Sequence, residues 1–250
     1  MRKRTALVTG GVGGIGSAIC KDFLENGYTV IANYYPAEEK HAQEWLKKHQ
    51  SGHEGRVFIV PGDVADFDSC VKMAEIIKKD HDFVDTLINC AGVTRDKTLR
   101  KMEPDMWNLV INIDLTGVYN VTKQFIDGMH DNEFGRIINI SSVNGQKGQF
   151  GQTNYSAAKA GVHGFTMALA QEMSRKNVTV NTISPGYVET DMTVGQMNAE
   201  ILDKIVGHVP MGRMARPEEV SYAVLALCDE RASYISGTNL GVNGGFFMSF

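Results

Sequence analysis

Short apolar runs rich in β-branched residues alternate with longer amphipathic segments along the chain. A short run bounded by turn residues is typical of a buried strand, and apolar residues at helical spacing are typical of a helix packed on a sheet. Seven runs are predicted to be strands: Thr5–Thr9, Thr29–Asn33, Val57–Val60, Val84–Asn89, Arg136–Ile140, Val178–Ser184 and Asn239–Val242. Strand–helix alternation predicts right-handed crossovers and a parallel sheet with helices on both faces. We therefore expect a doubly wound α/β fold of about seven strands.

The sequence has 250 residues, of which 43% are hydrophobic, and it shows no internal repeat, low-complexity tract or Pro/Gly-rich linker. We therefore expect a single domain over residues 1–250. A formal net charge of −4 gives no general electrostatic case for binding nucleic acid or an acidic membrane surface. The apolar run behind the basic start is too short for a signal peptide, and no run approaches a membrane span. The sequence thus predicts a cytoplasmic protein that binds neither nucleic acid nor a membrane.

The four cysteines stand at positions 20, 70, 90 and 228, without a C-x-x-C pair or zinc-like spacing. Free thiols in a reducing compartment account for them most simply. We expect no metal site.

A glycine-rich loop separates the first predicted strand from the first predicted helix. Five glycines occur between Gly10 and Gly16, and a helical pattern begins near Ile15. Glycine lets the backbone turn tightly and approach a pyrophosphate that rests on the helix N-terminus, whereas an ordinary turn needs only one. The loop therefore predicts a dinucleotide-binding site of the Rossmann type. Its expected contacts are Gly10, Val12, Gly13, Gly14, Ile15 and Gly16.

The end of the second predicted strand bears on the choice of cofactor. No Asp or Glu occurs there before Glu38, although a carboxylate at that strand end binds the ribose 2′-hydroxyl of NAD and repels a 2′-phosphate. Lys40 and His41 follow, so the sequence favours NADP (NADPH), with Lys40 near the phosphate. Alternatively, Lys40 is a solvated helix residue, as most lysines are. After the third strand, Asp63 and Val64 are expected at the adenine edge, unless Asp63 simply caps the next helix.

Two further strand ends carry small residues that allow the backbone close to a flat ligand. The residues after the fourth strand are Asn89, Cys90, Ala91 and Gly92. The sixth strand runs into a proline–glycine turn that we expect to lie against a nicotinamide ring. The expected contacts of that turn are Pro185, Gly186 and Val188.

Two segments leave alternatives open. Arg95, Lys97, Arg100 and Lys101 lie within seven residues of one another. They are either solvated surface or a site for the phosphates of a carrier-bound substrate. The methionine-rich stretch from Met192 to Pro210 is either a mobile lid over the substrate or a pair of surface helices.

The chemistry-bearing stretch runs from Ser141 to Lys159. Two serines directly follow the fifth predicted strand, and Tyr155 and Lys159 stand four residues apart in the next helix, so both lie on one face. An ammonium near a phenol favours the phenolate, so we expect Lys159 to lower the pKa of Tyr155 below its reference of about 10. Tyr155 is then a proton donor near neutral pH, with Ser142 holding the acceptor oxygen.

The same Y-x-x-x-K spacing occurs a second time, at Tyr119 and Lys123. Thirteen residues before Tyr119 stands Met106, inside a predicted helix, whereas Ser142 precedes Tyr155 by the same interval at the carboxyl end of a strand. Open α/β sheets place their ligands at such strand ends. We therefore interpret Tyr119 as a structural helix residue and Tyr155 as the catalytic one.

Asn112 lies in a predicted helix that is otherwise rich in apolar residues. Asparagine is poor for helix propensity, so this residue is either exposed or functional. The motif order and spacing over the whole chain resemble the short-chain dehydrogenase/reductase family, with T-G-x-x-x-G-x-G from Thr9, N-x-A-G from Asn89 and P-G at Pro185. The resemblance implies a catalytic tetrad of Asn112, Ser142, Tyr155 and Lys159, of which Tyr155 and Lys159 also contact the cofactor. Cys90 departs from the family, which usually has a second asparagine there.

Within that family, the run from Asn144 to Tyr155 is similar to the acetoacetyl-CoA reductases of polyhydroxybutyrate synthesis. The resemblance implies a homotetramer that reduces acetoacetyl-CoA to (R)-3-hydroxybutyryl-CoA with NADPH. It also implies contacts to the acetoacetyl-thioester from Asp96, Ser142, Gln149, Phe150, Gln152 and Tyr187. The nearest alternative is a 3-oxoacyl-carrier-protein reductase. A non-catalytic nicotinamide sensor would not need Tyr155 and Ser142 in register, and a hydrolase lacks the G-x-S-x-G elbow.

Overall fold

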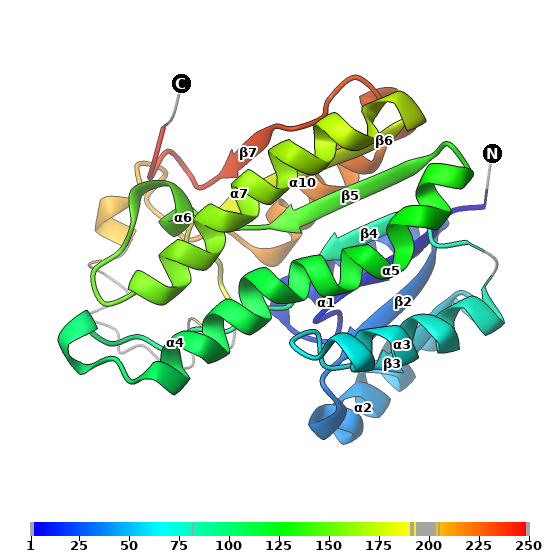
Figure 1. Ribbon diagram of the computed structural model, residues 1–250, viewed down its shortest axis with the longest axis horizontal. Helices are drawn as coiled ribbons and strands as arrows, with labels where there is room; N and C mark the ends of the chain where they lie inside the picture. The colour runs from blue at the N-terminus through cyan, green and yellow to red at the C-terminus, as the bar shows by residue number, and fades with distance from the viewer. Residues whose placement is uncertain (1–2, 82, 191–192, 194–203, 205, 249–250) are drawn as a thin grey trace.

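The computed structural model describes residues 3–81, 83–190, 193, 204 and 206–248 (Figure 1). Its centre is one seven-stranded sheet in which all pairs are parallel, in the order β3-β2-β1-β4-β5-β6-β7. The strands are β1 (Thr5–Val8), β2 (Thr29–Tyr34), β3 (Val57–Pro61), β4 (Thr86–Asn89), β5 (Gly135–Ile140), β6 (Val178–Pro185) and β7 (Asn239–Val242). The predicted doubly wound α/β fold is therefore confirmed, with strand ends that differ by one or two residues.

Helices flank the sheet on both faces. They are α1 (Gly14–Glu25), α2 (Glu39–Gln50), α3 (Phe67–Asp80), α4 (Pro104–Ile111), α5 (Gly117–Asp131), α6 (Asn144–Lys147), α7 (Thr153–Met173) and α10 (Pro217–Cys228). A π-helical turn, η3 (Asn112–Thr116), joins α4 to α5. None of the helices in the described ranges is long and apolar enough to cross a bilayer. Most of the stretch from Met192 to Pro210, for which a lid was one expectation, lies outside the described residues.

Alternation along the strands divides the core into two layers. In β1, Ala6 and Val8 pack in the cluster formed with α1, α2 and α10, while Leu7 packs in the cluster formed with α3, α5 and α7. Figure 1 shows α5 and α7 in front of the sheet and α1 and α10 behind it. Both faces are thus buried, which explains why these strands read as continuous apolar runs. The carboxyl ends of the strands are not covered by these two layers, and ligands are expected to bind there.

A buried ion pair fixes the amino end of the sheet. Arg4 and Asp85 are 7% and 1% exposed, and the Arg4 guanidinium donates to the carboxylate of Asp85 and to the hydroxyl of Thr86. The second oxygen of Asp85 accepts the Thr5 amide at 2.9 Å. This pair ties the start of β1 to the start of β4, at the end of the sheet opposite the strand ends expected to bind ligands.

The helix after β3 is capped by Asp66. Its side chain accepts the amides of Asp68 at 2.9 Å and Ser69 at 3.3 Å. Asp63 instead accepts the Ala65 amide at 2.9 Å, within the turn that precedes the helix. The alternative that Asp63 caps this helix is therefore wrong.

We expect Asp66→Ala to lower the free energy of unfolding by about 1 kcal/mol, because two amides at the start of α3 lose their acceptor. Urea unfolding followed by circular dichroism measures the change. Asp66→Asn is the matched control, since asparagine is an equally good cap, and its loss should be much smaller. Equal losses in the two variants would mean that the charge, and not the hydrogen bond, carries the effect.

Candidate active site

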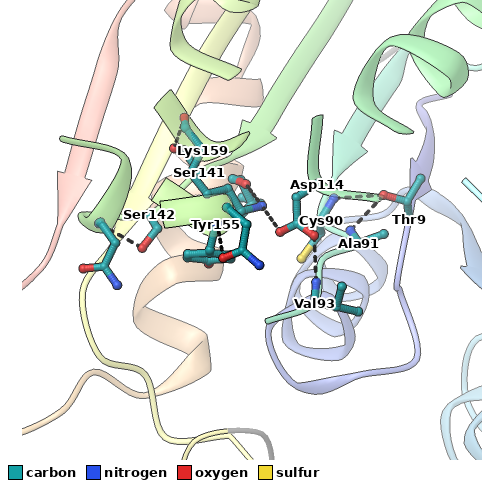
Figure 2. A network of polar contacts seen from close by, with 12 residues as sticks. Thr9, Cys90, Ala91, Val93, Asp114, Ser141, Ser142, Tyr155 and Lys159 are labelled. Carbon is teal, nitrogen blue, oxygen red and sulfur yellow. Dashed lines mark hydrogen bonds and ion pairs between the residues drawn. The ribbon is translucent and has the colours of Figure 1, made fainter. Parts of the chain in front are cut away.

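A threonine joins the ends of the two central strands. Thr9 directly follows β1, and its Oγ1 accepts the backbone amides of Cys90 at 2.9 Å and Ala91 at 3.0 Å (Figure 2). Thr9 and Cys90 lie where the sheet order reverses, between β1 and β4. Open α/β sheets bind ligands at this switch point.

Several glycines of the loop after β1 are required by backbone conformation or by close neighbours. Gly10 has φ +61°, in the left-handed region that favours glycine. A Cβ on Gly16 would lie 3.0 Å from the Gly11 Cα and closer still to the carbonyl oxygen of Gly10. A Cβ on Gly14 would meet the methyl group of Thr190 at 2.7 Å. The loop is therefore a compact cradle that leads directly into α1.

The N-terminus of α1 suits an anionic group. Gly13 is its N-cap, no side chain of the described residues caps it, and its first turn contains no acidic residue. Helix N-termini present free amides and a partial positive charge to phosphate. The residues present therefore fit a dinucleotide, which would be held by the loop from Gly10 to Gly16, in which Val12 is buried and Ile15 partly buried.

Asn33, at the end of β2, holds the loop from the other side. Its backbone oxygen accepts the Gly11 amide at 2.9 Å, and its Oδ1 accepts the Gly10 amide at 3.4 Å. Its Nδ2 donates to the Gly62 carbonyl at 3.0 Å. The side chain is therefore committed to the scaffold. Lys40, in the first turn of α2, is exposed to solvent. This exposure is compatible both with a contact to the 2′-phosphate of NADP and with an ordinary solvated lysine.

The remaining cofactor candidates line the same edge. Val64 is buried and its carbonyl accepts the Asn120 side chain at 2.9 Å. Asn89 donates to Asn139 at 2.8 Å and to Thr122 at 3.1 Å, so it links β4 to β5 and α5 beneath the site. The turn after β6 lies beside the serine loop, because the Val143 amide donates to the carbonyl of Pro185. Gly186 packs on Asn243, and Val188 is buried.

Ser142, Tyr155 and Lys159 come together at the carboxyl end of β5, as predicted. The Ser142 hydroxyl accepts the Asn144 amide at 3.1 Å and lies near enough to Tyr155 to act on its pKa, which it lowers. Lys159 Nζ lies 5.6 Å from the Tyr155 ring centroid and donates to the Ile140 carbonyl at 3.0 Å. Figure 2 shows the ammonium between the tyrosine and Asp114. In this arrangement the Ser142 and Tyr155 hydroxyls can both donate to one oxygen of a ligand, and the Lys159 ammonium lies beside the tyrosine.

Asp114 is a site residue that the sequence reasoning missed. It is 0% exposed, and its Oδ2 lies 3.1 Å from Lys159 Nζ. Its Oδ1 accepts the Val93 amide at 2.9 Å. A Cβ on Gly92 would lie 2.9 Å from Oδ2, so glycine at that position leaves room for the carboxylate.

Asn112 does not join the other three predicted catalytic residues, and this prediction is corrected. Its side chain is exposed, and the place beside Lys159 belongs to Asp114. Residues two apart on a helix point to nearly opposite sides, so the two side chains cannot share a face. The apolar spacing carries the signal: Asp114 continues the buried series of Val110, Gly117, Val118 and Val121.

Burial sets the direction of the pKa shift for Tyr155 and Asp114, whereas neighbouring charge sets it for Lys159. Burial raises the pKa of Tyr155; Lys159 opposes that shift, and Asp114 adds to it. The expected direction for Tyr155 was therefore wrong, although Lys159 acts in the predicted sense. Burial alone would lower the pKa of Lys159, but the neighbouring Asp114 and Tyr155 raise it. Burial raises the pKa of Asp114 against the effect of Lys159.

The expected substrate residues form a chain of contacts beside Ser142. Gln152 donates to Asp96 at 2.8 Å and accepts from Asn144 at 2.9 Å, and the Asn144 amide reaches Ser142. Gln149 is partly buried and accepts from the Lys147 ammonium at 3.2 Å.

Aromatic rings border that chain of contacts. Phe150 is 87% exposed, so it has the space to meet a ligand. Tyr187 packs on Phe246 with ring centroids 5.4 Å apart, and Lys147 lies 4.5 Å from the Phe246 centroid. Phe246, from the C-terminal segment, was not foreseen, because only the fold brings it to this edge.

The second Y-x-x-x-K pair is a surface feature, as interpreted. Tyr119 is 50% exposed and stacks on Phe67. Lys123 pairs with Asp127 at 3.7 Å along α5. All four cysteines carry free thiols, as predicted.

Comparisons with known proteins agree with this geometry. Residues 4–200 match the family model described as short chain dehydrogenase. The chain is 54% identical over 245 residues to an acetoacetyl-CoA reductase of Allochromatium vinosum, covering 98% of this chain and 99% of the relative. It is 50% identical over 249 residues to an acetoacetyl-CoA reductase of Cupriavidus necator, covering 99% and 100%. It is 41% identical over 245 residues to a 3-oxoacyl-[acyl-carrier-protein] reductase of Vibrio harveyi, covering 98% of both chains.

We expect Gly16→Ala to destabilise the protein by about 1–3 kcal/mol, because the added methyl group would overlap the Gly10 carbonyl. Urea unfolding without added dinucleotide measures this loss. Gly13→Ala is the matched control: its Cβ would meet nothing closer than the Gly10 oxygen at 3.7 Å, so the loss should be small. A Gly16→Ala protein as stable as the control would contradict the packing described for the loop.

Proposed function

The chain belongs to the short-chain dehydrogenase family and is an oxidoreductase, and from this premise we propose that it reduces acetoacetyl-CoA to (R)-3-hydroxybutyryl-CoA with NADPH. The observation that carries the proposal is the cluster at the end of β5. Ser142 lies near enough to Tyr155 to act on its pKa, and the buried ammonium of Lys159 lies 5.6 Å from the centroid of the tyrosine ring. Two relatives that match nearly full length are named acetoacetyl-CoA reductase.

The chain's own residues manage the proton and the carbonyl oxygen. The loop from Gly10 to Gly16 would hold NADPH, which would supply a hydride for the 3-carbonyl carbon. The Ser142 and Tyr155 hydroxyls donate hydrogen bonds to the carbonyl oxygen, which gains negative charge as its double bond to carbon opens. Tyr155 then gives its proton to that oxygen, and Lys159 stabilises the phenolate left behind. One hydride and one proton thus convert the ketone to the alcohol.

The substrate residues support a short acyl group on a large carrier. Asp96, Gln152 and Ser142 are linked through Asn144, so the loop that faces the reacting carbonyl is held in one arrangement. The exposed Arg95 and Lys97 stand next to Asp96, where they suit the phosphates of CoA. The same basic residues would suit an acidic carrier protein, which keeps a 3-oxoacyl-carrier-protein reductase as the second candidate. The higher identity to the CoA-named relatives favours CoA.

The cellular setting is proposed on the same grounds. We infer a cytoplasmic homotetramer that serves polyhydroxybutyrate synthesis. The edge strand β7 supports self-association, because it ends the sheet and exposes Leu240. A single domain over residues 1–250 is part of the proposal, and the single sheet supports it.

We expect Tyr155→Phe to reduce kcat for acetoacetyl-CoA at least about 100-fold, because the ring remains and the proton donor is lost. Initial rates of NADPH oxidation measure this change. Tyr119→Phe is the matched control, with the same spacing to a lysine on an exposed helix face, and should retain the parent rate. Normal turnover by Tyr155→Phe would remove the proposed acid from the mechanism.

We expect Lys40→Ala to raise the KM for NADPH about tenfold while leaving the KM for NADH unchanged, because only NADPH carries the 2′-phosphate. Steady-state kinetics with each cofactor measures the two constants. Lys47→Ala, an exposed lysine in the last turn of the same helix, is the control. An unchanged KM for NADPH would identify Lys40 as an ordinary surface lysine.

A further inference from the structure

A fully buried carboxylate stands in the site without a role in the proposed reaction. Asp114 is 0% exposed, in the π-helical turn between α4 and α5. Aspartate is almost never buried completely unless it is paired. Lys159, the nearest cation, is 4% exposed and points at it.

The surroundings of this carboxylate are shaped for the ion pair. Oδ1 takes the Val93 amide, and among the described residues Oδ2 has no hydrogen-bond partner apart from the ammonium 3.1 Å away. A Cβ on Gly92 would lie 2.9 Å from Oδ2 and 3.4 Å from Lys159 Nζ. The loop after β4 therefore closes directly over the pair and excludes any larger side chain.

We propose that Asp114 is a positioning residue whose buried carboxylate holds the Lys159 ammonium beside Tyr155 and sets the pH at which the tyrosine–lysine pair gives up its proton. The proposal rests on the proposed function for its catalytic meaning, because it concerns the same Tyr155. It differs from a packing role, which would require a side chain of this shape but not its charge.

Two other titratable groups act on the pair, Cys90 on Lys159 and Asp96 on Tyr155, and a third, His163, follows Lys159 on the same helix. Cys90, at the end of β4, has its pKa raised to about 12 by burial, so it stays a neutral thiol. His163, one helical turn beyond Lys159, has its Nε2 3.1 Å from the Ser141 hydroxyl, and burial lowers its pKa, which favours the neutral imidazole. Asp96, in the loop, adds negative charge near Tyr155. Asp114 is thus the carboxylate in direct contact with the lysine.

The direction of the effect follows from the charges. Asp114 acts to raise the pKa of both Tyr155 and Lys159. Removing its negative charge lowers the proton affinity of both groups, and the coupled pair loses its first proton at lower pH whichever group releases it. We expect Asp114→Asn to shift this titration to lower pH by about one unit or more.

The experiment measures the titration in two ways. The first is the pH dependence of kcat for oxidation of 3-hydroxybutyryl-CoA, which requires the pair in its deprotonated form. The second is the ultraviolet absorbance of tyrosinate in the protein alone. Because the chain has eight tyrosines, the signal of Tyr155 is the difference between proteins with and without Tyr155→Phe. Parent and Asp114→Asn are compared in both.

Asp85→Asn is the matched control, since it removes another buried carboxylate from an ion pair far from the site. We expect an acid shift for Asp114→Asn in both measurements and none for Asp85→Asn. An unshifted tyrosinate titration in Asp114→Asn would overturn the proposal. A shifted tyrosinate titration in a protein without activity towards 3-hydroxybutyryl-CoA would support the proposal and contradict the proposed substrate.

If Asp114→Asn unfolds at high pH before its titration is complete, the coupling of the two charges is measured instead from melting temperatures near neutral pH. Lys159→Met strands the buried carboxylate without its cation, whereas Lys159→Met with Asp114→Asn removes both charges. We expect the double variant to melt at a higher temperature than Lys159→Met alone near neutral pH. A double variant no more stable than Lys159→Met would show that the two charges are not coupled, and would overturn the proposal.

Discussion

The geometry of the site depends on the contacts that hold the buried ammonium of Lys159. A cation removed from water is costly unless acceptors surround it. The Ile140 carbonyl and Asp114 supply those acceptors, at 3.0 and 3.1 Å. They belong to the end of β5 and to the turn between α4 and α5, whereas Lys159 and Tyr155 belong to α7. Three separate parts of the fold must therefore pack correctly before the lysine can lie beside Tyr155.

The parallel sheet makes that convergence possible, because all of its strands end at one edge. Side chains at the strand ends then join neighbouring segments. Thr9 links the end of β1 to the segment after β4, and Asn33 links the end of β2 to the glycine loop. The side chains of Thr9 and Asn33 therefore bind other parts of the protein. The N-terminus of α1, the Ser142 hydroxyl and the Tyr155 phenol are the groups expected to bind ligands.

The sequence predicted the seven strands well, because most of them are buried on both faces, rich in apolar residues and bounded by turns, although the edge strand β7 is only partly buried. It also placed Tyr155, and not the exposed Tyr119, beside Ser142 and Lys159, since only Tyr155 follows a strand end at the right interval. It failed at Asn112, where family spacing outweighed the helical periodicity that places Asp114 on the buried face. The pKa of Tyr155 was misjudged because nearby charge can be read from spacing, whereas burial depends on the packed fold. The position of Phe246 against Tyr187 depends on long-range packing, so no local sequence pattern indicates it.

The most direct test of the account is the initial rate of NADPH oxidation with acetoacetyl-CoA, measured beside the same acyl group on a carrier protein. The account predicts a higher kcat/KM for acetoacetyl-CoA, with (R)-3-hydroxybutyryl-CoA as the product. Turnover of the carrier-protein thioester without turnover of acetoacetyl-CoA would contradict it.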